Sequence, residues 1–377
     1  MRSIVATTIG LFALVFASSQ ACSSNSGQQG FTDNPDSGSG SGGGSSGGSS
    51  GGSSGGLVGD GGGVMDEGGD GSITVTNTIY AHSDMTLYSV DPMSQAVTVV
   101  GPFMGTSDSS TDSVVTDLAV DSADEVYVNT ESVVYKAALP ATLPGTVSLT
   151  KVATIQGTSK FYALAFAPAG ALDPANEVLV GGDSAGALWS INTMTGATVN
   201  LGSFGLDKSV AGNSFVLSGD IVFYNDSSNN PTGLATIRSC PAGKSNTITN
   251  CPNGDYLASV DMTALKTAYT SMTAAASLLG GIYGATTANG VTTGPGKGTG
   301  FGDVFGLGAW NSTVFGFTRA ITTPAAAPQL ITIDTTTGVG TSVHSFTFSK
   351  PDDGWSGAGV TTKVTISVPK PPPPPAQ

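Results

Sequence analysis

A short unit that recurs along the chain constrains its fold more than any other feature. Copies begin at four leucines: Leu87 (LYSVDPMSQ), Leu188 (LWSINTMTG), Leu257 (LASVDMTAL) and Leu330 (LITIDTTTG). In each copy an apolar residue alternates with a small or polar one, and an Asp or Asn follows. This alternation is typical of a β-strand, and the residues after it are typical of a hairpin turn. A recurring strand and turn predict a repeat architecture made of β-sheets.

The same alternation divides the chain into sets of four expected strands. The first set has three members, at 78–83, 86–91 and 97–103. Three later sets are complete: 117–121, 125–130, 133–137 and 151–156; 163–167, 177–182, 187–192 and 198–204; 304–310, 313–318, 330–334 and 341–348. Between the third and the last lies a stretched set, with strands at 213–219, 220–225 and 256–261 and a fourth around 278–283. It is interrupted by a long polar insertion.

One strand is left over near the C-terminus, at 357–364 (GAGVTTKV). It resembles the first member of a set, and the first set lacks one member. If the C-terminal strand completes that set, the chain closes into a ring. A closed ring leaves no large open sheet edge, which is how radial β arrays avoid edge-to-edge association.

Through its Leu-x-Ser-Val-Asp-x-x-Thr-Gly unit, the chain resembles β-propellers of the broad group with quinoprotein-like and NHL-like repeats. The resemblance covers about residues 73–368. It implies an all-β β-propeller of four-stranded blades around a central channel, closed by the C-terminal strand. We count five blades, and the longer spacings are compatible with six or seven.

The resemblance also implies a role for the polar residue of each unit. That residue would end the third strand of a blade and cap the following turn through its side-chain oxygen; the four positions are Asp91, Asn192, Asp261 and Asp334. Gly196 and Gly338 would take the positive φ that the hairpin requires. Residues 262–279 are rich in Ala and Leu and are expected to form a helix outside the blades.

The N-terminus reads as an export signal. Arg2 is followed by an apolar stretch at 4–17 that is too short to span a bilayer comfortably, which predicts a signal peptide over residues 1–21. Ser19-Gln20-Ala21-Cys22 is similar to the lipobox of bacterial lipoproteins, although Ser19 stands where that motif usually has Leu. We therefore expect lipidation at Cys22, with ordinary secretion after cleavage near Ala21 as the alternative.

Cysteine usage agrees with an exported, lipidated chain. The chain has 3 cysteines, and an unpaired one is unfavourable in an oxidising compartment. Cys240 and Cys251 lie close together in one polar segment and are expected to form a disulfide. Cys22 is then left over, and acylation would account for it.

The regions on either side of the expected propeller are low in complexity. Residues 22–72 include a run made wholly of Gly and Ser at 37–56, which cannot bury enough apolar surface to fold. We expect a disordered spacer between a membrane anchor and the folded domain. The tail, residues 369–377, is proline-rich and is expected to be a polyproline II rod.

Composition limits the partners. The net charge is −14, which opposes nucleic acid and anionic lipid headgroups, because both need basic patches. The only expected contact with a membrane is through the lipid anchor. We expect a monomer at the outer membrane or cell surface, with a soluble secreted or periplasmic protein as the alternative.

Few residues suggest chemistry. The chain has 2 histidines, too few for the metal centres that some propeller enzymes carry at the channel mouth. Its tryptophans fall away from the repeat ends where quinoprotein repeats carry theirs, so no quinone cofactor is expected. The densest acidic run outside the spacer includes Asp108, Asp112 and Asp117. Its oxygens suit Ca²⁺, and a solvated loop is the alternative.

Two functions fit these features. The first is a non-enzymatic cell-envelope lipoprotein whose propeller is a scaffold for binding a protein or glycan ligand. The second is a hydrolase or lactonase-type enzyme that uses carboxylates at the channel, which rests on fold analogy alone. Three or more carboxylates that converge in the channel would favour the enzyme, and a channel lined by Ser, Thr and Ala would favour the scaffold.

Overall fold

The computed structural model describes residues 78–106, 112–207, 210–244, 250–251, 255–271, 289–290, 301–319, 321–322, 325–335, 337–349, 352–363 and 365–366. The expected signal peptide, Cys22, the spacer, Asp108 and the proline-rich tail lie outside these residues. Within the described part of the chain, no helix is long and apolar enough to cross a membrane.

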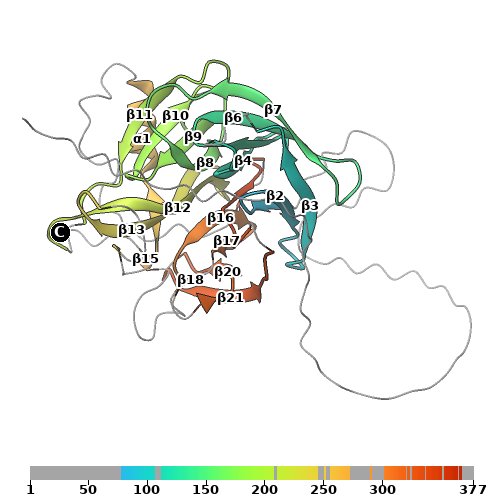
Figure 1. Ribbon diagram of the computed structural model, residues 1–377. Helices are drawn as coiled ribbons and strands as arrows, with labels where there is room; N and C mark the ends of the chain where they lie inside the picture. The colour runs from blue at the N-terminus through green and yellow to red at the C-terminus, as the bar shows by residue number, and fades with distance from the viewer. Residues whose placement is uncertain are drawn as a thin grey trace, which may run out of the picture.

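The fold is all-β, as the alternation predicts, and the described strands assemble mainly into groups of four (Figure 1). The first group is β22 (Gly357–Val360), β1 (Ile79–His82), β2 (Thr86–Val90) and β3 (Val97–Met104). The second is β4 (Asp117–Val120), β5 (Val126–Asn129), β6 (Val133–Ala138) and β7 (Val147–Thr154), and β3 and β7 join the two groups into one eight-stranded sheet. The third group is β8 (Phe161–Ala167), β9 (Val178–Asp183), β10 (Ala187–Ile191) and β11 (Thr198–Ser203).

The remaining strands complete two further groups and a small hairpin. The fourth group is β12 (Asn213–Asp226), β13 (Pro231–Pro241), β14 (Tyr256–Val260) and β15 (Asn289–Gly290), with β23 (Thr365–Ile366) parallel to β12. The fifth is β16 (Val304–Trp310), β17 (Thr313–Thr318), β20 (Gln329–Ile333) and β21 (Gly340–Ser345), and β18 (Ile321–Thr322) pairs with β19 (Ala325–Ala326). The described helix α1 spans Met262–Thr270.

The C-terminal strand completes the first group. β22 pairs antiparallel with β1, from Ile79 opposite Val360 to His82 opposite Gly357. This is the place that the surplus strand was expected to fill, and it joins residues almost a whole domain apart in sequence. The first and second groups are also linked at their outer edges, where β3 runs parallel to β7.

The first strands of the five groups lie next to one another in a closed circuit. β4 contacts β8, β8 contacts β12, β12 contacts β16, β16 contacts β22, and β22 contacts β4. We call these five the inner strands. Apolar side chains of neighbouring groups pack between the sheets. One such cluster centres on the fully buried Trp355, whose ring meets Tyr88, Phe317 and Phe346 edge to face.

The prediction for the fourth group was partly wrong. Residues 213–219 and 220–225 were expected to be two strands, but they form one strand, β12, with an irregularity between Leu217 and Ile221. The second strand is β13, which lies where a polar insertion was expected. The bulge interrupts the period of two, so one long strand looks like two short ones. The strand expected around 278–283 falls outside the described residues.

Three of the four repeated units end in the expected turn. The strands β2, β10, β14 and β20 are each third in their group. The side-chain oxygens of Asp91, Asn192 and Asp334 accept hydrogen bonds from the backbone of the following turn, whereas Asp261 caps the N-terminus of helix α1 instead of a turn. Gly196 and Gly338 have φ values of 72° and 74°, which makes glycine the favoured residue there.

Candidate functional site

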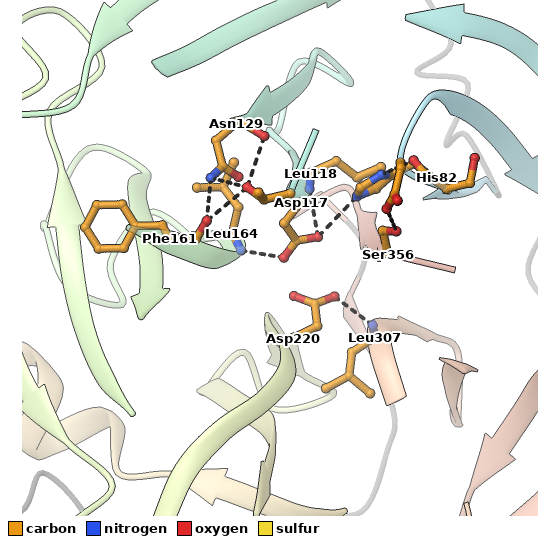
Figure 2. A network of polar contacts seen from close by, with 12 residues as sticks. His82, Asp117, Leu118, Asn129, Phe161, Leu164, Asp220, Leu307 and Ser356 are labelled. Carbon is orange, nitrogen blue, oxygen red and sulfur yellow. Dashed lines mark hydrogen bonds and ion pairs between the residues drawn. The ribbon is translucent and has the colours of Figure 1, made fainter. Parts of the chain in front are cut away.

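Two aspartates of the inner strands meet at the centre of the circuit. Asp117 begins β4, and Asp220 follows the bulge of β12; both side chains are 0% exposed. Their carboxyl groups point toward one another in Figure 2. We call them the central carboxyl pair. Glycine is required beside them on β22, because a Cβ at Gly357 would lie 2.0 Å from Asp117 Oδ1.

Each carboxyl group of the pair joins two neighbouring sheets. Asp117 accepts hydrogen bonds from the backbone N–H of its own neighbour Leu118 (2.8 Å) and of Leu164 on β8 (2.6 Å). Asp220 does the same with Ile221 (2.6 Å) and with Leu307 on β16 (2.7 Å). The inner strands are first in their groups, and next to the two aspartates no described strand pairs with their inner edges, although β23 pairs with the far end of β12. The carboxyl oxygens satisfy N–H groups there that would otherwise be buried unpaired.

Burial, together with repulsion from Asp220, raises the pKa of Asp117 well above its usual range. Burial likewise raises the pKa of Asp220, to about 8. Two desolvated carboxyl groups that face each other cannot both be ionised without strong repulsion. We therefore expect the pair to hold at least one proton at neutral pH.

His82 lies beside the pair. Its Nδ1 is 2.7 Å from the carbonyl oxygen of Ser83, so Nδ1 carries the proton and donates it to that bond. Its Nε2 is 3.8 Å from Asp117 Oδ1 and has no hydrogen-bond partner within the described structure. Burial lowers the pKa of His82 to about 4, which keeps the ring neutral.

A third buried aspartate repeats the arrangement between the fourth and fifth groups. Asp255 accepts the backbone N–H of Val304 (2.7 Å) and the Nε of Arg238 (2.6 Å), and Arg238 also donates to Asp303 (2.8 Å). Arg238 is 1% exposed and Asp255 is 0% exposed. Burial raises the pKa of Asp255, while Arg238 opposes that shift. This ion pair is away from the central pair and does not add a third carboxylate to it.

A pocket of about 720 Å³ opens where the inner strands begin. Its lining combines apolar side chains with small hydroxyl groups, and includes Val115, Val216, Leu217 and Phe305 together with Thr116, Ser184, Ser218 and Ser356. The size falls within the range of small-molecule sites. Thr116 and Gly219, which line the pocket, directly precede the two aspartates, so the pair lies one residue deeper along the strands.

The central carboxyl pair lies beneath the floor of this pocket, and neither Asp117 nor Asp220 contributes to its lining. Further along the inner strands lies a space of about 10 Å³, walled by apolar residues such as Phe166, Phe223 and Val360. That volume is at the lower limit for a single water molecule. The inner strands are therefore closely packed at this level.

One edge of the pocket carries an ion cluster. Arg319 donates to both carboxyl oxygens of Asp84 (3.1 and 2.8 Å) and to Asp353 (2.5 Å), and Ser356 also bonds to Asp84. Hydrogen bonds from Arg319 and Ser356 outweigh burial and lower the pKa of Asp84, which keeps that carboxyl ionised. The guanidinium is thus held on two sides by carboxylates.

The other edge is held by the disulfide. Cys240 and Cys251 are bonded, as their spacing predicts, and both are fully buried against Val216, a pocket residue. The bond fastens the segment that follows β13, in which Pro241 and Lys244 line the pocket. The disulfide that the sequence predicts therefore supports one wall of the pocket.

Of the three residues proposed for calcium, the structure describes Asp112 and Asp117. Asp112 lies near the surface and accepts a hydrogen bond from Ser132, whereas Asp117 belongs to the central carboxyl pair; Asp108 is outside the described residues. No group of three His, Cys, Asp or Glu side chains that could hold a metal occurs in the part of the chain that the structure describes.

The sequence pattern singled out Asp117 but not Asp220, and it assigned Asp117 to a calcium loop. The sequence does carry a signal for such aspartates. Asp117, Asp220 and Asp303 each stand directly before a short apolar run of an inner strand (DLAV, DIVF, DVFG). Ser218 and Lys244 have no comparable signal, because the bulge and the disulfide place them.

Comparisons with known proteins find similar structures but no match in sequence. No protein-family model and no curated protein match it in sequence. A crystal structure of a protein of unknown function from Bacteroides caccae is 10% identical, with 75% of this chain and 97% of that chain covered and a TM-score of 0.35. PorZ, a surface component of the type-IX secretion system of Porphyromonas gingivalis, is 14% identical over 70% of this chain and 31% of PorZ, with a TM-score of 0.28. The designed protein Ika8 is 13% identical over 77% of this chain and 62% of its own, with a TM-score of 0.25. Similarity at this level is too low to assign a function.

Proposed function

We propose that this chain is a non-enzymatic binding module of the bacterial cell envelope. In this proposal the five groups of strands are the blades of a five-bladed β-propeller that β22 closes, and Cys22 carries a lipid anchor. The binding site is the pocket where the inner strands begin. The closed circuit of inner strands supports the propeller, because radial β arrays bring the first strand of every blade to the centre.

The observation that carries the proposal is the composition of the pocket. Its walls are mainly apolar side chains and Ser or Thr hydroxyl groups, with Asp84, Arg319 and Lys244 as the charged residues, while the two central carboxyl groups are buried beneath it. Concave sites with apolar walls and a few polar groups are typical of small-molecule binding. The hydrolase alternative needs carboxylates that reach a substrate. Both carboxyl groups of the buried pair instead accept hydrogen bonds from backbone N–H groups of adjacent sheets.

The pocket is tested by a variant that fills it. Ala185 is exposed and lines the pocket, so Ala185→Trp occupies part of its volume without altering the core. Met194, which is 86% exposed in a hairpin turn outside the lining, offers the matched control Met194→Trp. We expect phenylnaphthylamine, an uncharged fluorescent probe, to bind wild type and the control equally. Its affinity should drop at least about tenfold in Ala185→Trp.

The enzyme alternative makes an opposite prediction. If the central carboxyl groups act on a substrate, hydrolysis of simple esters or lactones should be measurable and should disappear in Asp220→Asn. Absence of turnover together with loss of probe binding in Ala185→Trp supports a binding module. Turnover that depends on Asp220 would contradict it.

The anchor is tested separately. Intact mass of the mature protein, combined with membrane fractionation, should show a diacylglyceryl increment at Cys22 and a membrane-bound chain. A soluble chain whose mass shows cleavage near Ala21 and a free Cys22 would support ordinary secretion.

A further inference from the structure

Ser218 lines the pocket, and its hydroxyl group is buried and unpaired among the described residues. It lies in the bulge of β12, where the pairing with β13 is interrupted between Leu217 and Ile221. The side chain is 3% exposed, and its Oγ has no hydrogen-bond partner among the described residues. Buried hydroxyl groups in native proteins are almost always hydrogen-bonded. A polar group of a ligand in the pocket would supply the missing partner.

The close packing of the bulge against β16 requires glycine at position 219. A Cβ at this position would lie 1.8 Å from the carbonyl oxygen of Val304 on the neighbouring inner strand. The close approach holds the bulge against β16, and Thr236 reinforces it by bonding to the same carbonyl (3.0 Å) and accepting the N–H of Asp220 (2.9 Å). The bulge is therefore fixed on both sides, and Ser218 is held at the pocket rather than free to turn into the ladder.

The side chain of Lys244 is the second polar group of the pocket lining that has no partner among the described residues. The charged residues of the pocket lining are Asp84, Arg319 and Lys244. Arg319 is bound by the carboxylates of Asp84 and Asp353, so its charge is already compensated. Lys244 lies in the turn after β13 that the disulfide fastens, and it forms no ion pair or side-chain hydrogen bond within the described structure. Among the described residues of the lining it is thus the cation without a carboxylate partner, in a chain whose net charge is −14.

Resting on the proposed function, we propose that the pocket takes a small amphipathic anion. Its apolar body would lie against Val216, Leu217 and Phe305, a polar group would bond to Ser218, and an acidic group would pair with Lys244. The apolar walls argue against a neutral glycan, which needs many hydrogen-bonding partners. The ammonium group of Lys244, which no described carboxylate pairs, favours an acidic ligand over an amine.

Two fluorescent probes that share one body test the inference. Anilinonaphthalene sulfonate and phenylnaphthylamine have the same aromatic rings and anilino N–H, and differ by a single sulfonate. The experiment uses the full-length chain with Cys22→Ser, so that neither lipid nor detergent competes for the probes. Affinities are measured in Lys244→Gln and in the control Lys151→Gln, whose lysine is exposed on β7 outside the pocket.

Lys244→Gln should weaken the sulfonate probe about fivefold and leave the uncharged probe within about twofold. Lys151→Gln should change neither. Added salt should weaken only the sulfonate probe, and this salt effect should shrink in Lys244→Gln. Ser218→Ala should weaken both probes about threefold and raise the Tm of the unliganded protein, because it removes the unpaired hydroxyl.

The outcomes separate the inference from the proposed function. Sulfonate binding that Lys244→Gln leaves unchanged, while Ala185→Trp abolishes it, would overturn the anion and keep the pocket as a binding site. Binding of neither probe, or binding that Ala185→Trp does not affect, would overturn the proposed function itself. A Ser218→Ala variant with unchanged affinity and unchanged Tm would remove the polar contact from the inference.

Discussion

The central carboxyl pair and His82 predict an unusual dependence of stability on pH. The folded-state pKa of Asp220 is raised to about 8 from a usual value of 3.8. Between these values the folded chain holds a proton that the unfolded chain has released. The contribution of this group to stability is therefore fully present below about pH 4 and is lost as the pH rises through 8.

His82 acts in the opposite direction over a narrower range. Its folded-state pKa is lowered to about 4 from 6.5. Between these values the unfolded chain holds a proton that the folded chain lacks, so stability from His82 rises with pH up to 6.5 and is constant above it. Between about pH 4 and 6.5 His82 offsets part of this effect, while the raised pKa of Asp117 adds to it. Above pH 6.5 His82 no longer offsets the decline, and the proton of Asp220 alone sets the smallest decline expected.

One proton per molecule changes the free energy of unfolding by about 1.4 kcal/mol for each pH unit. Over the roughly 1.5 units from pH 6.5 to 8, the chain should lose about 2 kcal/mol. Urea unfolding at a series of pH values measures this loss. The fluorescence of Trp355, which is fully buried among aromatic rings, reports the transition.

Three variants isolate the cause. Asp220→Asn should reduce the decline above pH 6.5, leaving the part that the buried Asp117 causes, while lowering stability at every pH by about 1–3 kcal/mol, because the amide cannot accept both backbone N–H groups. His82→Gln should steepen the decline between pH 4 and 6.5. Asp173→Asn, at an exposed loop carboxylate, should leave the slope above pH 6.5 unchanged. A wild-type stability that is flat or rising from pH 6.5 to 8, or a slope that is unchanged in Asp220→Asn, would refute the reasoning.

Three further substitutions test how the pocket and the sheets are held. Replacing Cys240 and Cys251, which are 11 residues apart, by Ser should lower the free energy of unfolding by about 3 kcal/mol in urea titrations, and an unchanged midpoint would contradict this. Gly219→Val brings a Cβ to 1.8 Å from a backbone oxygen and should cost at least about 3 kcal/mol, seen as a fall in Tm; a Tm within a few degrees of wild type would show that β16 can move. Arg238→Ala leaves the carboxylate of Asp255 buried without its cation and should cost about 3–5 kcal/mol by thermal unfolding, whereas a cost below about 1 kcal/mol would mean that Asp255 is already protonated.

Local patterns predicted the strands well, and the reason is physical. Side chains alternate across a strand, so a strand with one buried face shows its period in the sequence wherever it is regular. The period failed at the bulge of β12, where Ser218 and Gly219 leave the ladder, and there one strand was taken for two. The disulfide between Cys240 and Cys251 was also predictable, because its partners are close in the chain.

The site was not predictable in the same way. Asp117 and Asp220 belong to different sheets, and nothing local indicates that their strands lie side by side at the centre. Asp117 was therefore assigned to a calcium loop, on composition alone. Its surroundings came from β8, β12 and β22, three segments that are distant in sequence.

The sequence by itself determined the all-β class, the turn at the end of three of the four repeated units and the strand that closes the first group. These depend on contacts between residues that are near in the chain, or on a count of strands. Only the tertiary structure decided that two carboxyl groups meet in a packed centre and that Ser218 and Lys244 share one pocket above them. Such meetings depend on how the sheets are arranged around the centre, and alternation within a strand carries no information about the neighbour that its inner edge will face.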